Sequence, residues 1–149
     1  MMIKPFIKVQ YPPSKKVFRA FKVSDLISYT GRIYIFDEKN FSRYRFYEEH
    51  EGTQLFSLSN EIAFLKDVRL FSAETLEYLF IRGVVATVGF DADESLTSIY
   101  RRFSRLHLVS FDEGSQKILE KAAPGYAEFK DLRLYVGISA LGYFFRREV

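Results

Sequence analysis

The sequence predicts an α+β fold in two parts: a small strand-rich N-terminal domain (residues 1–70) and an α/β C-terminal domain (residues 71–149). Three observations support this prediction. Short β-rich stretches dominate the first third of the chain, a helical pattern after Ser72 leads into an uncharged β-branched run at residues 84–88, and further apolar stretches follow. A helix that leads into a buried strand, with later strands and a covering helix, predicts a central mixed sheet flanked by helices.

Alternation of apolar and other residues predicts strands through most of the N-terminal domain. The expected strands are residues 5–11, 17–23, 33–36 and 41–47. A short helical turn is expected from Ser24 to near Gly31, and residues 37–40 are expected to form a turn. In the last of these strands Arg43 and Arg45 alternate with aromatic residues, which predicts a hairpin-like sheet with an arginine and tyrosine face.

Three- and four-residue spacing of apolar residues then predicts helices. The first such series is Leu58, Ile62, Leu65 and Val68. The second is expected to begin at an N-cap, Ser72, with Glu74 in its first turn, and to end at Gly83. Beyond it we expect strands at residues 84–88, 105–111, 132–138 and 143–149, a helix at 115–123 and a turn at 139–142.

Composition excludes several classes of protein. The 149 residues are 48% hydrophobic, which excludes a disordered tail, and the absence of cysteine excludes disulfide scaffolds and thiolate metal sites. Two histidines, His50 and His107, argue against a zinc centre, so we expect no cofactor and no metal. The longest uncharged stretch, residues 134–145, is too short to cross a bilayer, and no secretion signal is evident. We therefore expect a cytoplasmic protein without a membrane partner.

Charge and aromatic content leave room for a nucleic-acid partner. The net charge is +3, the isoelectric point is near 9.0, and aromatic residues make up 17% of the chain. Aromatic side chains interleaved with arginine can stack on unpaired bases, whereas the simpler interpretation is that they fill a core and a subunit interface.

Several features from Phe56 to the C-terminus occur in the order found in one enzyme family. They are Phe56-Ser57-Leu58 before residues 61–65, Leu76-x-x-Leu79-x-x-Arg82-Gly83, Gly89-Phe90 five residues later, Ala92-Asp93, Tyr100, Lys130-Asp131-Leu132 opening a buried strand, and Tyr143-Phe144-Phe145 near the end. With these features the chain resembles the archaeal tRNA-splicing endonuclease family. The resemblance implies a C-terminal domain of the restriction-endonuclease-like type.

The resemblance also implies a chemistry, namely RNA cleavage without metal to 2′,3′-cyclic phosphate and 5′-hydroxyl ends. A tyrosine acts as base on the 2′-hydroxyl, a histidine protonates the leaving 5′-oxygen and a lysine stabilises the charged phosphorane. Tyr100, His107 and Lys130 follow the family's order. However, the family's Gly-Ala-Asp-Phe run is replaced by residues 91–94, and Phe103 stands where the family has its histidine.

These departures favour a structural subunit over a catalytic one. Its role would be to complete a hetero-oligomer, expected to be a tetramer, with a catalytic endonuclease subunit that excises introns from pre-tRNA. The alternative is a catalytic subunit that uses Tyr100, His107 and Lys130. We expect RNA contacts from Arg101, Arg102, Arg105, Arg43 and Arg45, although a solvated charged face fits these residues equally well.

The terminal aromatic residues are candidates for a subunit interface. Tyr143, Phe144 and Phe145 lie on the expected last strand, and an unpaired strand edge invites another strand. The alternative is that this strand lies inside the chain's own sheet.

Two rival functions remain open. Glu128-Phe129-Lys130 has the acid-x-Lys form of metal-dependent nucleases, for which Asp91, Asp93 or Asp112 would supply a further carboxylate. Residues 33–111 also resemble, more weakly, the β-rich N-terminal dimerisation domain of the CRISPR adaptation integrase, which would leave a scaffolding role without catalysis.

Overall fold

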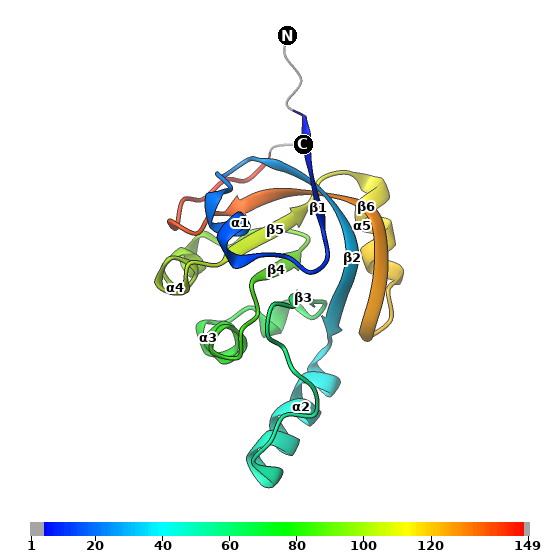
Figure 1. Ribbon diagram of the computed structural model, residues 1–149, viewed down its shortest axis with the longest axis vertical. Helices are drawn as coiled ribbons and strands as arrows, with labels where there is room; N and C mark the ends of the chain where they lie inside the picture. The colour runs from blue at the N-terminus through cyan, green and yellow to red at the C-terminus, as the bar shows by residue number, and fades with distance from the viewer. Residues whose placement is uncertain (1–4, 148–149) are drawn as a thin grey trace.

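The computed structural model of the chain describes residues 5–147, in which six strands form one sheet with helices around it (Figure 1). The strands are β1 (Phe6–Gln10), β2 (Leu26–Phe36), β3 (Ile62–Leu65), β4 (Ala86–Gly89), β5 (Leu106–Ser110) and β6 (Gly125–Ile138). The α-helices are α1 (Lys15–Ala20), α2 (Glu38–Glu51), α3 (Ala73–Ile81), α4 (Thr97–Phe103) and α5 (Glu113–Lys121), with 3₁₀ turns η1 (Val68–Leu70) and η2 (Glu94–Leu96). The predicted α+β class with a mixed sheet is confirmed.

Five of the strands close into a ring. β2, β3, β4 and β5 run parallel in chain order, and β6 runs antiparallel both to β5 and to β2. β6 can pair with both neighbours because it is 14 residues long. β1 lies outside the ring and pairs in parallel with the first half of β2. This arrangement places the carboxyl ends of β3, β4 and β5 at one end of the ring, where open α/β sheets commonly bind ligands.

The sheet is buried on both faces. Alternate residues of the strands enter two different apolar clusters: Ile33 and Ile35 lie in one, and Tyr34 and Phe36 in the other. The first cluster also receives Phe18 from α1, and the second packs the sheet against α2, α3 and α4. Burial on both faces explains why the strands have continuous apolar runs instead of alternation.

The ring crosses the predicted domain boundary, so the prediction of two domains at residues 1–70 and 71–149 is corrected. β2 and β3 precede residue 70, and β4, β5 and β6 follow it, yet all five strands belong to one sheet. The error came from β3, whose four residues are all buried. Ile62 and Leu65 therefore belong to a strand, and the helical spacing predicted around them was wrong.

Capping residues explain two further corrections in the N-terminal part. Residues 17–23, predicted as a strand, include most of α1, which begins at its N-cap Ser14. Residues 41–47, also predicted as a strand, lie in α2, where Asp37 and Asn40 form a reciprocal capping box with two bonds of 2.8 Å. The helical turn predicted after Ser24 is likewise wrong, because β2 begins at Leu26.

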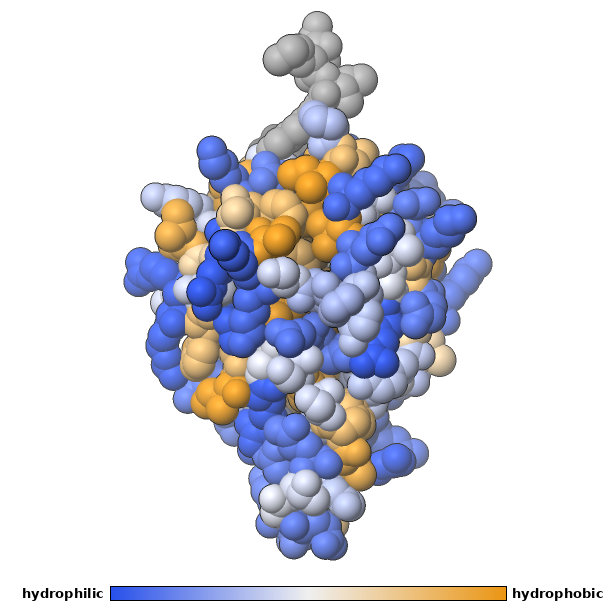
Figure 2. All heavy atoms as spheres, in the orientation of Figure 1, coloured by the Kyte–Doolittle hydropathy of each residue, from blue (hydrophilic) through white to orange (hydrophobic). Residues whose placement is uncertain are grey.

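α2 projects from the body of the molecule (Figure 1), and the surface over its projecting end is mainly hydrophilic (Figure 2). Phe41 and Tyr44, nearer its start, are buried against the sheet. Gly52 ends the helix in the left-handed conformation.

Much of the C-terminal half follows the prediction, although α4 and the first half of β6 were not predicted. α3 begins at the N-cap Ser72 and is followed by Gly83 at a positive φ of 99°, where a Cβ would lie 2.9 Å from the backbone of Ser59. The strands at β4 and β5, the helix α5 and the second half of β6 lie where the sequence placed them. Among the described residues, no helix has the length and apolar character needed to cross a membrane.

Candidate functional site

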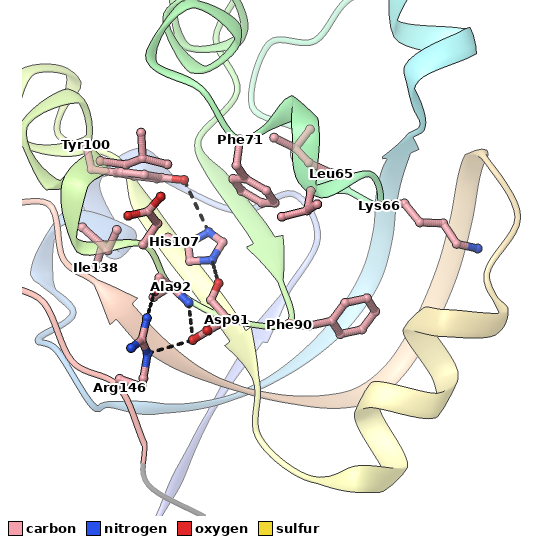
Figure 3. A pocket seen from close by; sticks show the side chains of 13 residues that line it. Leu65, Lys66, Phe71, Phe90, Asp91, Ala92, Tyr100, His107, Ile138 and Arg146 are labelled. Carbon is pink, nitrogen blue, oxygen red and sulfur yellow. Dashed lines mark hydrogen bonds and ion pairs between the residues drawn. The ribbon is translucent and has the colours of Figure 1, made fainter.

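A pocket of about 480 Å³ lies beside the carboxyl ends of β3 and β4 (Figure 3). α4 bounds the pocket on one side, and η1 and the loop that follows β4 form its mouth. The lining residues are Leu65, Lys66, Val68, Phe71, Phe90, Asp91, Ala92, Asp93, Leu96, Tyr100, His107, Ile138 and Arg146.

One side of the pocket is apolar. The ring of Phe71 stands edge-on to the imidazole of His107, with 5.2 Å between ring centroids, and Phe90 stands edge-on to Phe64 at 5.4 Å. At the mouth Val68 is 79% exposed, which leaves a large apolar side chain without a covering partner in the described chain. Gly89 leaves room for these two rings: a Cβ there would lie 3.1 Å from both His107 and Phe71.

The charged groups lie at the rim. Arg146 binds Asp91 Oδ1 at 3.1 Å and the carbonyl oxygen of Ala92 at 2.8 Å, so its charge is matched by a carboxylate. Asp93 accepts bonds from the backbone and side chain of Ser95, which lower the pKa of its carboxyl group. Lys66 donates to the carbonyl oxygen of Ala122 at 2.6 Å, and no ion pair of Lys66 occurs within residues 5–147.

A buried chain of hydrogen bonds joins Tyr100, Thr87 and His107. His107 Nε2 lies 2.7 Å from the carbonyl oxygen of Asp91, which can only accept, so Nε2 carries the proton. Nδ1 of the neutral ring then accepts from Thr87 Oγ1 at 2.7 Å, and Thr87 accepts from the Tyr100 hydroxyl at 2.6 Å. Every donor in this chain is therefore already engaged within the protein.

Burial shifts both titratable groups of this chain away from catalysis. Loss of solvation lowers the pKa of His107 to about 4 and raises the pKa of Tyr100 above its usual value. These shifts favour the neutral imidazole of His107 and the un-ionised phenol of Tyr100 at pH 7. The roles that the resemblance implies for these two residues need the opposite shifts.

The third residue of the expected triad lies elsewhere. Lys130 is exposed on β6, eight residues before Ile138, which is the residue that pairs with His107. Eight residues of strand correspond to about 26 Å along β6. The structure brings Tyr100 and His107 together but not Lys130, so these three residues do not form one site in the described chain.

The predicted RNA-binding arginines divide into exposed and engaged groups. Arg101 and Arg43 are exposed on α4 and α2, and Arg102, also exposed on α4, pairs with Glu77 at 3.1 Å. Arg45 is paired with Glu74 at 3.5 Å and with Glu49 at 3.8 Å.

Arg105 is not a surface residue. Its guanidinium is buried and donates to the carbonyl oxygens of Val84, Phe103 and Phe80 at 2.7, 2.8 and 3.3 Å. Two of these carbonyls belong to the last turns of α3 and α4, where a positive charge complements the helix dipole. The prediction that Arg105 contacts RNA is therefore corrected to a structural role.

The terminal aromatic segment folds back on the chain's own sheet. Phe144 forms a single bridge with Ile138, and the backbone of Phe145 donates to Gly137 at 2.8 Å. Phe144 and Phe145 are half-buried against the core, while Tyr143 is 64% exposed. The strand predicted at residues 143–149 is wrong over its described part, and residues 148–149 lie outside the described residues. Of the three predicted interface residues, Tyr143 is open to a partner.

The carboxylates proposed for metal-dependent cleavage are dispersed. Glu128 and Lys130 both point outward from β6, Asp91 binds Arg146, and Asp112 caps α5. Within residues 5–147, no group of three or more His, Asp and Glu side chains is placed to hold a metal ion.

Lys66 and Phe71 of the pocket lining, and Thr87, which bonds Tyr100 and His107, were not predicted from the sequence. One signal was present: Phe90 and Asp91 directly follow the strand predicted at residues 84–88, and residues after a parallel strand lie at the binding edge of the sheet. In the comparisons with known proteins, no family model and no curated protein matches the sequence. The site is therefore interpreted from its geometry.

Proposed function

We propose that this chain is a binding domain that holds a small, mainly apolar molecule carrying one acidic group in the pocket beside β3 and β4. The observation that carries the proposal is the pocket itself: about 480 Å³, walled by Leu65, Phe71 and Phe90, with Val68 exposed at its mouth. Ligand sites of this size are typically lined by apolar side chains with a few polar groups that fix orientation.

Lys66 selects the acidic group. The other charges at the rim have partners of their own, because Arg146 is paired with Asp91, and Asp93 binds Ser95. The Lys66 ammonium binds a neutral carbonyl, and no carboxylate within residues 5–147 pairs with it. In Figure 3 its side chain extends outward from the edge of the pocket, away from His107, so the acidic end of a ligand would lie at that outer edge.

Binding is favoured over catalysis by the state of the polar wall. The Tyr100–Thr87–His107 chain uses its protons internally and has its last donor on the Asp91 carbonyl. It can shape the pocket and position the loop after β4, but it offers no general acid or base at neutral pH.

Two fluorescent probes that differ in charge test this proposal. 8-Anilinonaphthalene-1-sulfonate is apolar with one acidic group, and N-phenyl-1-naphthylamine is its neutral relative. We expect both to bind at one site per chain. Val68→Asp places a carboxylate at the mouth and should weaken both probes by about tenfold or more.

The matched control is Ile118→Asp, which makes the same kind of change on the exposed face of α5, away from the pocket. Lys66→Gln should weaken the sulfonate by about fivefold, the value of an exposed ion pair, and leave the neutral probe unchanged. Equal binding by the wild type, Val68→Asp and Ile118→Asp would overturn the proposal.

A second candidate function is that of a non-catalytic subunit of the tRNA-splicing endonuclease. This proposal also assigns the C-terminal part of the chain to the fold type of that endonuclease. The observation that favours it is that Arg101, Arg102 and Tyr143 are all exposed, as a contact with RNA or with another subunit requires. Gly142 packs against Arg101, which brings the residues before Tyr143 next to α4. The test is cleavage of an intron-containing pre-tRNA by this chain alone, by a catalytic homologue, and by the mixture. Cleavage that requires the mixture supports this role, and an unchanged rate on adding the chain contradicts it.

A further inference from the structure

The positive charge of the chain is concentrated at its start. The first 24 residues contain six Lys and Arg residues and no Asp or Glu, and Asp25 is the first acidic residue. The other 125 residues hold 16 basic and 19 acidic side chains. The whole positive excess of the protein therefore comes from one short segment.

The fold places four of these charges on one small surface around α1. Phe18 and Phe21 point into the core beneath it and hold the segment on the sheet. Lys16, Arg19 and Lys22 are exposed and Lys15 is half-buried. We call these four residues, Lys15, Lys16, Arg19 and Lys22, the α1 basic surface.

No side chain of this surface forms an ion pair within residues 5–147, although the Asp25 carboxylate accepts from the backbone N–H of Lys22 at 2.8 Å. Ion pairs with carboxylates begin only at Arg32 in the described chain. Burial lowers the pKa of Lys15, and the nearby positive charges of Arg105 and Arg19 lower it further. The surface is thus a cluster of like charges whose mutual repulsion a bound polyanion would relieve.

We propose that the α1 basic surface binds the phosphate backbone of a nucleic acid, independently of the pocket. Four cations within eight residues of chain can each contact a phosphate, and such contacts need only spaced positive charges. A membrane surface fits less well, because four cations without a broad apolar face give only weak electrostatic adsorption to anionic lipid. Here Phe18 and Phe21 are turned inward, and Val17, 49% exposed, is the large apolar side chain left outside on α1.

The test measures binding of a labelled duplex of about 20 base pairs, in one arm DNA and in the other RNA, by fluorescence anisotropy from about 50 to about 200 mM NaCl. With four phosphate contacts, the logarithm of the binding constant should fall against the logarithm of salt concentration with a slope of about −3 to −4. The two arms distinguish the two sources of the same phosphate chemistry.

A quadruple variant with Lys15→Gln, Lys16→Gln, Arg19→Gln and Lys22→Gln should lose at least about tenfold in affinity at low salt and most of the slope. The matched control carries Lys39→Gln, Lys117→Gln, Lys121→Gln and Lys130→Gln, four exposed residues on α2, α5 and β6, and changes the net charge equally. It should bind as the wild type does. Equal loss in both variants would show that net charge, not this surface, causes binding, and would overturn the proposal.

A single variant keeps the test decisive if the quadruple variant folds poorly. Lys16→Gln changes one exposed side chain and should reduce the magnitude of the salt slope by about one.

Two other probes separate the competing partners: vesicles of phosphatidylcholine and phosphatidylserine, and poly-glutamate. Binding to either of these with none to the duplexes would overturn the proposal.

Discussion

Two clusters of buried polar side chains occupy the same sheet, and they are kept in opposite states of charge. Next to the amino end of β3, Glu61 binds Arg32 and Tyr11. Between β4, β5 and α4, the Tyr100–Thr87–His107 chain is uncharged and ends on a backbone carbonyl. The first cluster maintains an ion pair, and the second removes a charge from a residue that titrates in water near neutral pH.

The charged cluster survives burial because both partners are closely matched. Glu61 is 2% exposed, and its Oε1 lies 2.5 Å from Arg32 Nη2 and 3.0 Å from the Tyr11 hydroxyl. The Arg32 guanidinium lies between the rings of Tyr11 and Tyr126, at 4.8 and 4.4 Å from their centroids. The Glu61 carboxylate raises the pKa of Arg32 above its usual value. The side chain of Arg32 also reaches solvent, which reduces the cost of its charge.

The neutral cluster has no counter-ion and no path to solvent comparable to that of Arg32. The imidazole of His107 is instead held in one tautomer, and each polar hydrogen atom of the chain has one acceptor. The comparison teaches that a counter-ion which itself reaches water decides whether a buried polar group in this fold is ionised, because Glu61 and His107 are equally buried. It also predicts that breaking the first cluster is more costly than breaking the second.

Glu61→Leu should have the largest effect, because it leaves the Arg32 guanidinium without its carboxylate. We expect a loss of about 3 kcal/mol in the free energy of unfolding, at the lower end for a broken buried pair since Arg32 is partly exposed. Urea-induced unfolding followed by circular dichroism measures it. Glu128→Leu is the control: Glu128 lies opposite Arg32 on β6 but is exposed, and it should change stability by less than about 0.5 kcal/mol. Equal effects would contradict the assignment.

The second prediction concerns pH. The pKa of His107 is lowered by burial from 6.5 to about 4. Between these values the unfolded chain binds a proton that the folded chain does not, so stability falls as the pH drops through this range and levels off below pH 4. From this group alone we expect a loss of about 2 kcal/mol between pH 6.5 and 4.5.

The readout is the difference between the wild type and His107→Asn, because the carboxylates of the protein contribute equally to both. The variant should be less stable than the wild type at pH 7, and the gap should narrow as the pH falls. A gap that stays constant from pH 7 to pH 4.5 would show that His107 does not remain neutral in the folded protein.

How far the sequence specified this molecule differs between its halves, for a physical reason. In the C-terminal half, strong local signals agree with the fold: Ser72 caps α3, Gly83 ends it, and the uncharged run at residues 84–88 is buried on both faces. In the N-terminal half, the caps Ser14 and Asp37 were overlooked in favour of alternation, and β3 is too short and too fully buried to show a period.

The site was less accessible to sequence analysis than the fold. Closure of the ring depends on β6 pairing with β2, a contact between residues about one hundred positions apart, and no local pattern encodes it. Tyr100 and His107 were singled out and do lie together, but the sequence could not show that Thr87 joins them or that the carbonyl of Asp91 fixes their protons. Burial, which decides their pKa values, is a property of the assembled fold.

The smallest effect separates the members of the neutral cluster. Thr87→Val preserves shape but removes the group that donates to His107 and accepts from Tyr100. Because the Tyr100 hydroxyl already lies 3.4 Å from His107 Nδ1, a small shift can replace the lost bond, so we expect a loss of only about 1 kcal/mol. Nitrogen NMR shifts of the imidazole should show Nε2 protonated in both the wild type and the variant at pH 7. A proton on Nδ1 would reverse the direction of the chain, and with it the conclusion that every donor beside the pocket is engaged.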